Sequence, residues 1–143
     1  MVNAQVRTLH EPDGTPVTNL AFDLSQTQIE SASLACGEML LERHRGQAMD
    51  TDAVLALREL TAVCDELGRL GEAQANAHVV LPLARYIVLH DTVDEWVESR
   101  HERGWLRKAD EDALPILDEM LMPMHALRGE AVAAALAEDK ASH

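Results

Sequence analysis

Aromatic side chains are scarce in this chain. Only four of its 143 residues are Phe, Tyr or Trp. Sites for bases, sugars and flat cofactors use aromatic rings for stacking, so the sequence argues against such sites. Basic residues are also few, since 12 Lys and Arg stand against 25 Asp and Glu, a formal charge of −13. A surface of this charge repels nucleic acid and anionic membranes, and we expect neither as a partner.

The chain also lacks the common catalytic motifs. No glycine-rich phosphate loop, Cys-x-x-Cys pair, His-Glu-x-x-His or Gly-x-Ser-x-Gly occurs, so no catalytic residue and no cofactor is predicted. The two cysteines, Cys36 and Cys64, lie inside helical patterns and are expected to stay reduced as small core residues. No secretory signal or uncharged stretch of membrane-spanning length is present. These absences favour a cytoplasmic protein that is not an enzyme.

The residues that are present suit one domain. A chain of 143 residues with 47% hydrophobic side chains can bury one core, so we expect a single domain over 1–143. Its excess of Ala, Leu and Arg, with few Lys, is common in bacteria with GC-rich genomes. Val- and Thr-rich stretches flank Pro12, Asp13 and Gly14, which predicts a β-hairpin or a mobile arm within 1–22. The helical pattern fades at the other end, and 138–143 are expected to fray.

Helix signals cover the rest of the chain. Ser25 and Gln28 form a capping box, and Asp50 supplies the cap of the next helix. Apolar residues at spacings of three and four continue each helix, and glycines such as Gly68 and Gly104 end two of them. The predicted helices cover 25–45, 51–68, 72–103 and 110–137.

The third of these helices is unusual. Between 73 and 90 it contains one charged residue, Arg85, and its apolar side chains cover most of the helix circumference. Pro82 lies inside this stretch and is expected to bend the helix. A helix that is apolar on nearly all sides needs more cover than one neighbour provides.

Together these elements predict an all-α fold, an up-and-down four-helix bundle with a small N-terminal β-hairpin. A bundle gives the 72–103 helix one interior face, so we expect a homodimer that buries the uncharged half of this helix. A basic protein is the other partner that the acidic surface would attract. The favoured function is therefore non-catalytic, through self-association or through binding of a protein partner.

One polar cluster is predicted between the third and fourth helices. His90 falls at the centre of the apolar stripe, with Asp94 and His101 on the same side of the helix. If the two helices are antiparallel, Asp118 and His125 lie near the level of His90. Two interpretations stay open. His90 and Asp94 form a buried structural pair, or His90, Asp94 and His125 line a metal- or small-molecule pocket that would make the chain a candidate enzyme.

Two metal templates fit this sequence only in part. Glu98 and His101 form one Glu-x-x-His, but a di-iron bundle needs a second copy and two inward glutamates, which Glu38 and Glu42 do not supply. The thioethers and imidazole within 120–125 suit Cu(I), yet methionine is also the usual filler of gaps beside a helix kink. No metal site is predicted.

Overall fold

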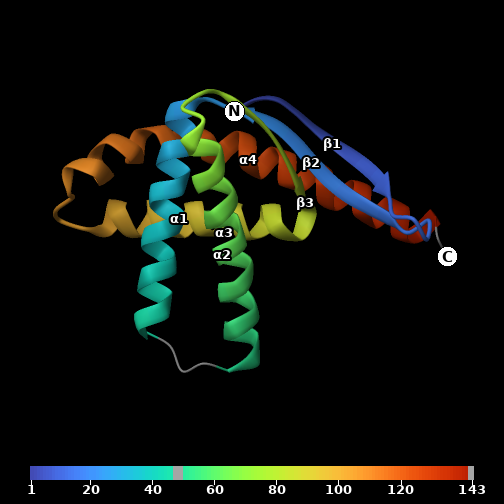
Figure 1. Ribbon diagram of the computed structural model, residues 1–143, viewed down its shortest axis with the longest axis horizontal. Helices are drawn as coiled ribbons and strands as arrows, with labels where there is room; N and C mark the ends of the chain where they lie inside the picture. The colour runs from blue at the N-terminus through green and yellow to red at the C-terminus, as the bar shows by residue number, and fades with distance from the viewer. Residues whose placement is uncertain (47–49, 142–143) are drawn as a thin grey trace.

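The computed structural model describes residues 1–46 and 50–141, and within them it contains four helices and one three-stranded antiparallel sheet (Figure 1). The fold is therefore α+β, and the predicted all-α class, an up-and-down four-helix bundle with a small hairpin, is wrong. The elements in chain order are β1 (Val2–His10), β2 (Pro16–Leu24), α1 (Gln26–Gly46), α2 (Thr51–Glu72), β3 (Ala77–Pro82), α3 (Leu83–Glu102) and α4 (Lys108–Ala141).

The main error lies in the segment predicted as a helix over 72–103. Residues 77–82 form β3, which pairs antiparallel with β2 and places Val79 opposite Phe22 and Leu81 opposite Leu20. Burial alternates along β3, with Val79 and Leu81 buried and Val80 exposed between them. This period of two is that of a strand with one covered face. The apolar character of 77–82 thus predicted correctly that side chains of this segment are buried, but the segment is a strand and not the predicted helix.

The third helix begins only after β3 ends. Pro82 occupies the N-cap position of α3, with φ −58° and ψ 148°, so the predicted bend inside a helix does not occur. A proline restricts the residue before it to extended backbone, which suits the last residues of a strand. The uncharged half of the predicted helix is therefore divided between β3 and the first turns of α3.

The hairpin turn lies at Pro12, Asp13 and Gly14. The amide of Gly14 donates to the carbonyl of Glu11 at 2.8 Å, and the amide of Glu11 donates to the carbonyl of Thr15 at 3.0 Å. Gly14 has φ +87°, in the left-handed region that favours glycine. This arrangement is a type I turn followed by a glycine bulge, a common three-residue hairpin loop. It joins β1 to β2, the central strand of the sheet.

The predicted caps of the first two helices are confirmed. The amide of Gln28 donates to Ser25 Oγ at 3.2 Å, and the amide of Ser25 donates to Gln28 Oε1 at 3.0 Å. Asp50 Oδ1 accepts from the amide of Ala53 at 2.7 Å. Both caps satisfy amides that a helix start leaves unpaired.

The second and fourth helices end later in the chain than predicted. α2 continues past Gly68 to Glu72, and α4 runs from Lys108 to Ala141 with Pro115 and Pro123 inside it. Residues 138–141 are helical, residues 142–143 lie outside the described residues, and the fraying expected over 138–143 stays a prediction. A helix of this length reaches along the whole molecule (Figure 1).

The elements are arranged in crossing layers (Figure 1). α1 and α2 form one antiparallel pair, which projects crosswise to the pair formed by α3 and α4, and the sheet covers the C-terminal half of α4. One apolar core joins these layers, and both cysteines are free, Cys36 inside it and Cys64 at its edge. Among the most buried side chains are those of Leu20, Phe22, Ile29, Leu60, Tyr86, Trp96, Leu117 and Met124.

A pair of glycine variants tests the hairpin turn. Gly14→Ala should destabilise the fold by about 1 kcal/mol, because alanine is strained at a positive φ. Gly68→Ala, at an exposed position inside α2 with no atom within 4 Å of the added Cβ, should stabilise it by about 0.5–1 kcal/mol. Urea denaturation measures the change in unfolding free energy of both variants, provided that its slope against urea concentration, the m-value, is unchanged. A shift of the same sign in both variants would contradict the turn assignment.

Candidate functional site

His90 is buried against α4 and is 7% exposed. Arg128 Nη1 donates to His90 Nδ1 at 3.1 Å and to Asp91 Oδ1 at 2.6 Å. The ring of Tyr86 stacks on the imidazole with centroids 6.5 Å apart, and the ring of His125 lies 5.9 Å away. The hydrogen-bond partner of His90 is therefore Arg128, and the predicted structural pair with Asp94 is replaced by this contact.

Electrostatics keep this imidazole neutral. Burial lowers the pKa of His90, and the nearby guanidinium of Arg128 lowers it further, while Asp91 and Asp94 oppose the shift. Asp94 itself is exposed and acts on His90 through its charge. A neutral imidazole can bind a metal, but Arg128 already occupies the Nδ1 lone pair. Over 1–46 and 50–141, no group of three or more His, Cys, Asp or Glu is arranged to hold a metal ion.

The other two predicted site residues form a separate contact. His101 Nε2 lies 2.7 Å from Asp118 Oδ2, and both side chains are about half exposed. This pair joins α3 to α4 on the surface. The structure thus confirms that the two helices run antiparallel past each other, but it divides the predicted cluster into a His90–His125 contact and a His101–Asp118 pair.

A buried ion cluster joins α1, α3 and α4, and sequence reasoning missed it. Arg100 is 1% exposed, and its Nη2 donates to Glu38 Oε2 at 2.7 Å and to Glu42 Oε1 at 3.0 Å. Trp96 Nε1 donates to the same Glu38 oxygen at 2.7 Å, and the Arg100 guanidinium lies 5.1 Å from the centroid of the Trp96 ring. Arg107 also donates to Glu38. The two Nη2 bonds join α3 to α1, whereas Nη1 donates to Ser99 of the same helix and Nε has no hydrogen-bond partner within the described residues.

Asp110 completes this cluster from the start of α4. It is fully buried, and within the described chain neither of its carboxyl oxygens has a hydrogen-bond partner. The closest cationic atoms are Arg100 Nε at 3.7 Å, Arg107 Nε at 3.8 Å and Arg103 Nη1 at 3.9 Å. Burial raises the pKa of Asp110, and the neighbouring Glu38 raises it further. Burial also raises the pKa of Glu38, but hydrogen bonds, first that from Trp96, lower it, and the net shift of this pKa is downward.

One sequence signal could have found this cluster. Arg100 lies four and seven residues after Trp96 and Val93, and it follows Val97 by three, so it falls within an apolar stripe. A cation in such a stripe requires buried anionic partners. Its partner Glu38 points away from the predicted apolar stripe of its own helix, and on that side it meets Trp96 and Arg100 of α3.

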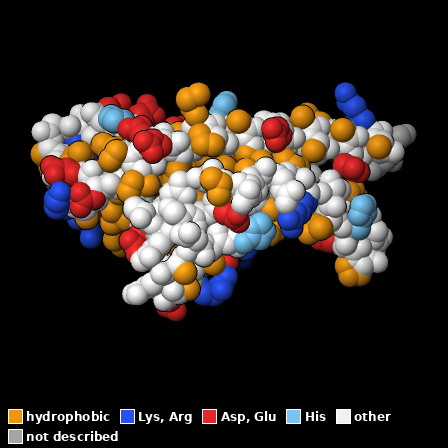
Figure 2. All heavy atoms as spheres, turned by 90° about the horizontal axis from the view of Figure 1, so that it is seen from above, with side chains coloured by type: hydrophobic (Ala, Val, Ile, Leu, Met, Phe, Trp, Pro, Cys, Tyr) orange, Lys and Arg blue, Asp and Glu red, His pale blue; other side chains and the backbone are white. Residues whose placement is uncertain are grey.

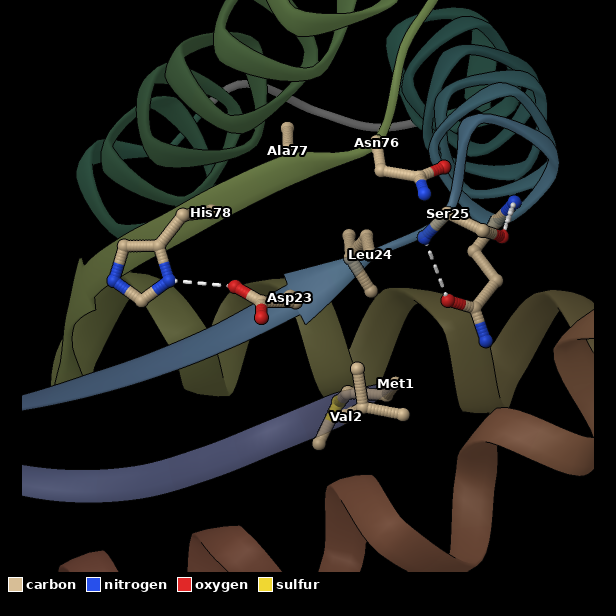
Figure 3. A pocket seen from close by; sticks show the side chains of 9 residues that line it. Met1, Val2, Asp23, Leu24, Ser25, Asn76, Ala77 and His78 are labelled. Atoms are coloured by element: carbon tan, nitrogen blue, oxygen red, sulfur yellow. Dashed lines mark hydrogen bonds and ion pairs between the residues drawn. The ribbon is translucent and has the colours of Figure 1, made fainter.

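One pocket of about 520 Å³ lies where the end of β2 meets the start of α1 (Figure 3). Its polar side chains bind one another. Asp23 accepts from Asn3 Nδ2 at 2.7 Å and lies 2.6 Å from His78 Nδ1, and the pKa of Asp23 is lowered first by Asn3 and then by His78. Ser25 and Gln28 form the capping box. Asp23 and His78 thus have a partner in each other, and Ser25 and Gln28 have one in the cap.

The outward face of α4 has a different character. Met122, Ala126, Gly129, Ala133 and Leu136 follow one another at spacings of four and three, so they form one line along the helix, which we name the outer stripe. All five are exposed, Met122 by 83% and Leu136 by 58%.

The outer stripe contains no charged residue over about 21 Å of helix. Val132 and His125 lie beside it and are also exposed. Hydrophobic side chains reach the surface along much of the molecule, with charged ones gathered in small groups (Figure 2). Apolar residues aligned on a solvent-facing helix mark an interaction site more often than scattered ones do.

Comparison with protein families, with curated proteins and with solved structures finds no match to this chain. The outer stripe is the candidate functional site, because its apolar side chains are exposed in one line, whereas His90 and the buried carboxylates lie close to cationic side chains of the same chain.

A variant of the buried arginine tests the ion cluster. Arg100→Ala should cost about 3–5 kcal/mol of unfolding free energy, because it leaves Glu38 and Asp110 buried without their central cation. Arg69→Ala removes an exposed pair with Glu66 and should change stability by less than about 0.5 kcal/mol. Equal losses in chemical denaturation would show that Arg100 does not hold the helices together.

The pH dependence of stability tests His90. The imidazole has an ordinary pKa of 6.5, and the folded value is lower, so the unfolded chain binds the proton more readily. The stabilisation should be complete above about pH 6.5 and should be lost as the pH falls toward the folded pKa. His90→Gln should flatten the fall of unfolding free energy between about pH 7 and 5. His10→Gln, at an exposed position, is the control; an unchanged slope in His90→Gln would refute this assignment.

Proposed function

We propose that this protein is non-catalytic and acts by self-association, forming a homodimer through the outer stripe of α4. The supporting observation is that five aligned positions of this helix are exposed and uncharged in a chain that carries a formal charge of −13. Burying Met122 or Leu136 fully would contribute about 1.5–3 kcal/mol per side chain. A second copy brings both residues again, so each substitution acts twice in a symmetric dimer.

This proposal moves the interface away from the segment 73–90. That segment was expected to need a partner because a helix there would be apolar on all sides. As β3 and the first turns of α3, it buries Val79, Leu81, Tyr86 and Leu89 within one chain. Other large apolar side chains, among them Leu41, Leu55 and Trp105, are also exposed, but Met122 and Leu136 lie on one line of α4.

A basic protein partner has less support. Two of the exposed acidic residues of α3 already bind cations of this chain, Asp91 with Arg128 and Glu95 with Arg43. The charge of those carboxylates is partly compensated within the chain, which weakens their attraction for a basic protein. A ligand pocket around His90 is likewise less favoured, because Arg128 uses its Nδ1 atom.

A cytoplasmic location belongs to the same proposal. None of the helices in 1–46 and 50–141 is both long enough and apolar enough to cross a bilayer. The two free thiols are compatible with a reducing compartment, and burial raises the pKa of Cys36, which keeps it protonated.

The oligomeric state tests the proposal. Analytical ultracentrifugation from about 1 to about 100 µM should show a dimer of twice 15.7 kDa that dissociates on dilution. Met122→Glu and Leu136→Glu should each yield the monomer, because a buried charge without a partner opposes association. Leu41→Glu, at a site 57% exposed on α1, is the matched control and should leave the dimer intact. A wild-type monomer over this whole range would refute the proposal.

A further inference from the structure

We infer that the two copies of α4 pair antiparallel about Gly129, so that each Asp118 meets Lys140 of the partner subunit. This inference rests on the proposed function and specifies its geometry. It follows from the order of residues along the outer stripe and from the charges at its two ends.

The outer stripe is symmetric about Gly129. Met122 lies seven residues before this glycine and Leu136 seven after it, while Ala126 lies three before and Ala133 four after. Large side chains therefore stand at both ends and small ones in the middle. Reversing the helix direction leaves this pattern nearly unchanged, so an antiparallel pair about Gly129 brings the small residues together at the centre and the large ones together at the ends.

Gly129 permits close approach at the centre. A Cβ built on Gly129 meets no atom within 4 Å, so the space in front of this residue is open. The distance between packed helix axes is set by the side chains at the contact, and glycine and alanine allow the shortest values. Two α4 helices can therefore touch at Gly129 while Met122 of one copy packs beside the partner's Leu136.

Opposite charges lie at the two ends of the outer stripe. Asp118 lies eleven residues before Gly129 and Lys140 eleven after it, and both continue the outward face of the helix. Asp118 Oδ2 lies 2.7 Å from His101 Nε2 of the same chain, so its second carboxylate oxygen, Oδ1, is the acceptor for the partner's Lys140. Antiparallel pairing about Gly129 brings Asp118 level with the partner's Lys140 at both ends. Arg128 and Glu130 point about 100° to either side, where Arg128 binds His90 and Asp91 of α3 and Glu130 is exposed.

The same charges oppose the parallel arrangement. A parallel twofold pair would place Asp118 beside the partner's Asp118 and Lys140 beside the partner's Lys140. Like charges at both ends repel, whereas the antiparallel pair replaces both repulsions with attractions. Electrostatics therefore select the antiparallel direction.

Disulfide trapping tests the direction of pairing. In a Cys64→Ser background, Met122→Cys chains are mixed with Leu136→Cys chains of different mass and oxidised gently. Mixed cross-links should exceed each homodimeric cross-link by about tenfold, because a disulfide needs Cα atoms about 4.4–6.8 Å apart. Leu41→Cys is the collision control. Dominant Met122→Cys homodimers, or cross-linking no greater than that of Leu41→Cys, would overturn the inference.

A charge exchange tests the register. Asp118→Lys and Lys140→Asp should each weaken the wild-type dimer by about tenfold, because each creates two like-charge contacts per dimer. The double variant should recover most of the affinity. Weakening without recovery, or no weakening at all, would overturn the register. A dimer that fails these two tests but is still disrupted by Met122→Glu would retain the proposed function, whereas a monomeric wild type would remove both.

Discussion

The central position of β2 determines how the other elements are arranged. Leu20, Phe22 and Leu24 are at most 1% exposed, and a strand so buried must be hydrogen-bonded along both edges and covered on its apolar face. β1 and β3 supply the edges. The C-terminal half of α4 and the start of α3 supply the cover (Figure 1). Because the sheet lies against the inner face of α4, the opposite face of this helix is left to solvent.

The buried ion cluster holds the opposite end of the molecule. Arg100 contacts Glu38 of α1 and lies near Asp110 of α4, so one guanidinium joins three helices whose pairs cross each other. Such a cluster costs desolvation energy and is a poor source of net stability, but removing one partner is expensive. Its directional contacts favour one crossing of the helix pairs over others. We regard orientation of α1 and α2 as its role.

Local signals predicted the elements better than they predicted the fold. The capping box at Ser25, the cap at Asp50 and the turn at Gly14 depend on a few adjacent residues, and these could be found from the sequence. Residues 77–82 could not, because an apolar run of this length suits a strand or a buried helix, and pairing with β2, more than fifty residues away, decides between them. The site was missed for a related reason. The sequence identifies His90 as a polar residue within a core stripe. It does not identify the outer stripe, because only the position of the sheet shows which side of α4 is covered.

The central proposal is that the α4 helix of a second copy of the chain covers the exposed face of α4. The most direct measurement is an isotope-filtered NOE experiment on a mixture of ¹³C-labelled and unlabelled chains, which detects only contacts between different copies. We expect intermolecular NOEs between the Met122 methyl group and the Leu136 methyl groups. We expect no intermolecular NOE that involves Leu41 or Leu55, which lie exposed on α1 and α2. Intermolecular NOEs to Leu41 and Leu55 instead, or a complete lack of them at a concentration where the protein is dimeric, would contradict it.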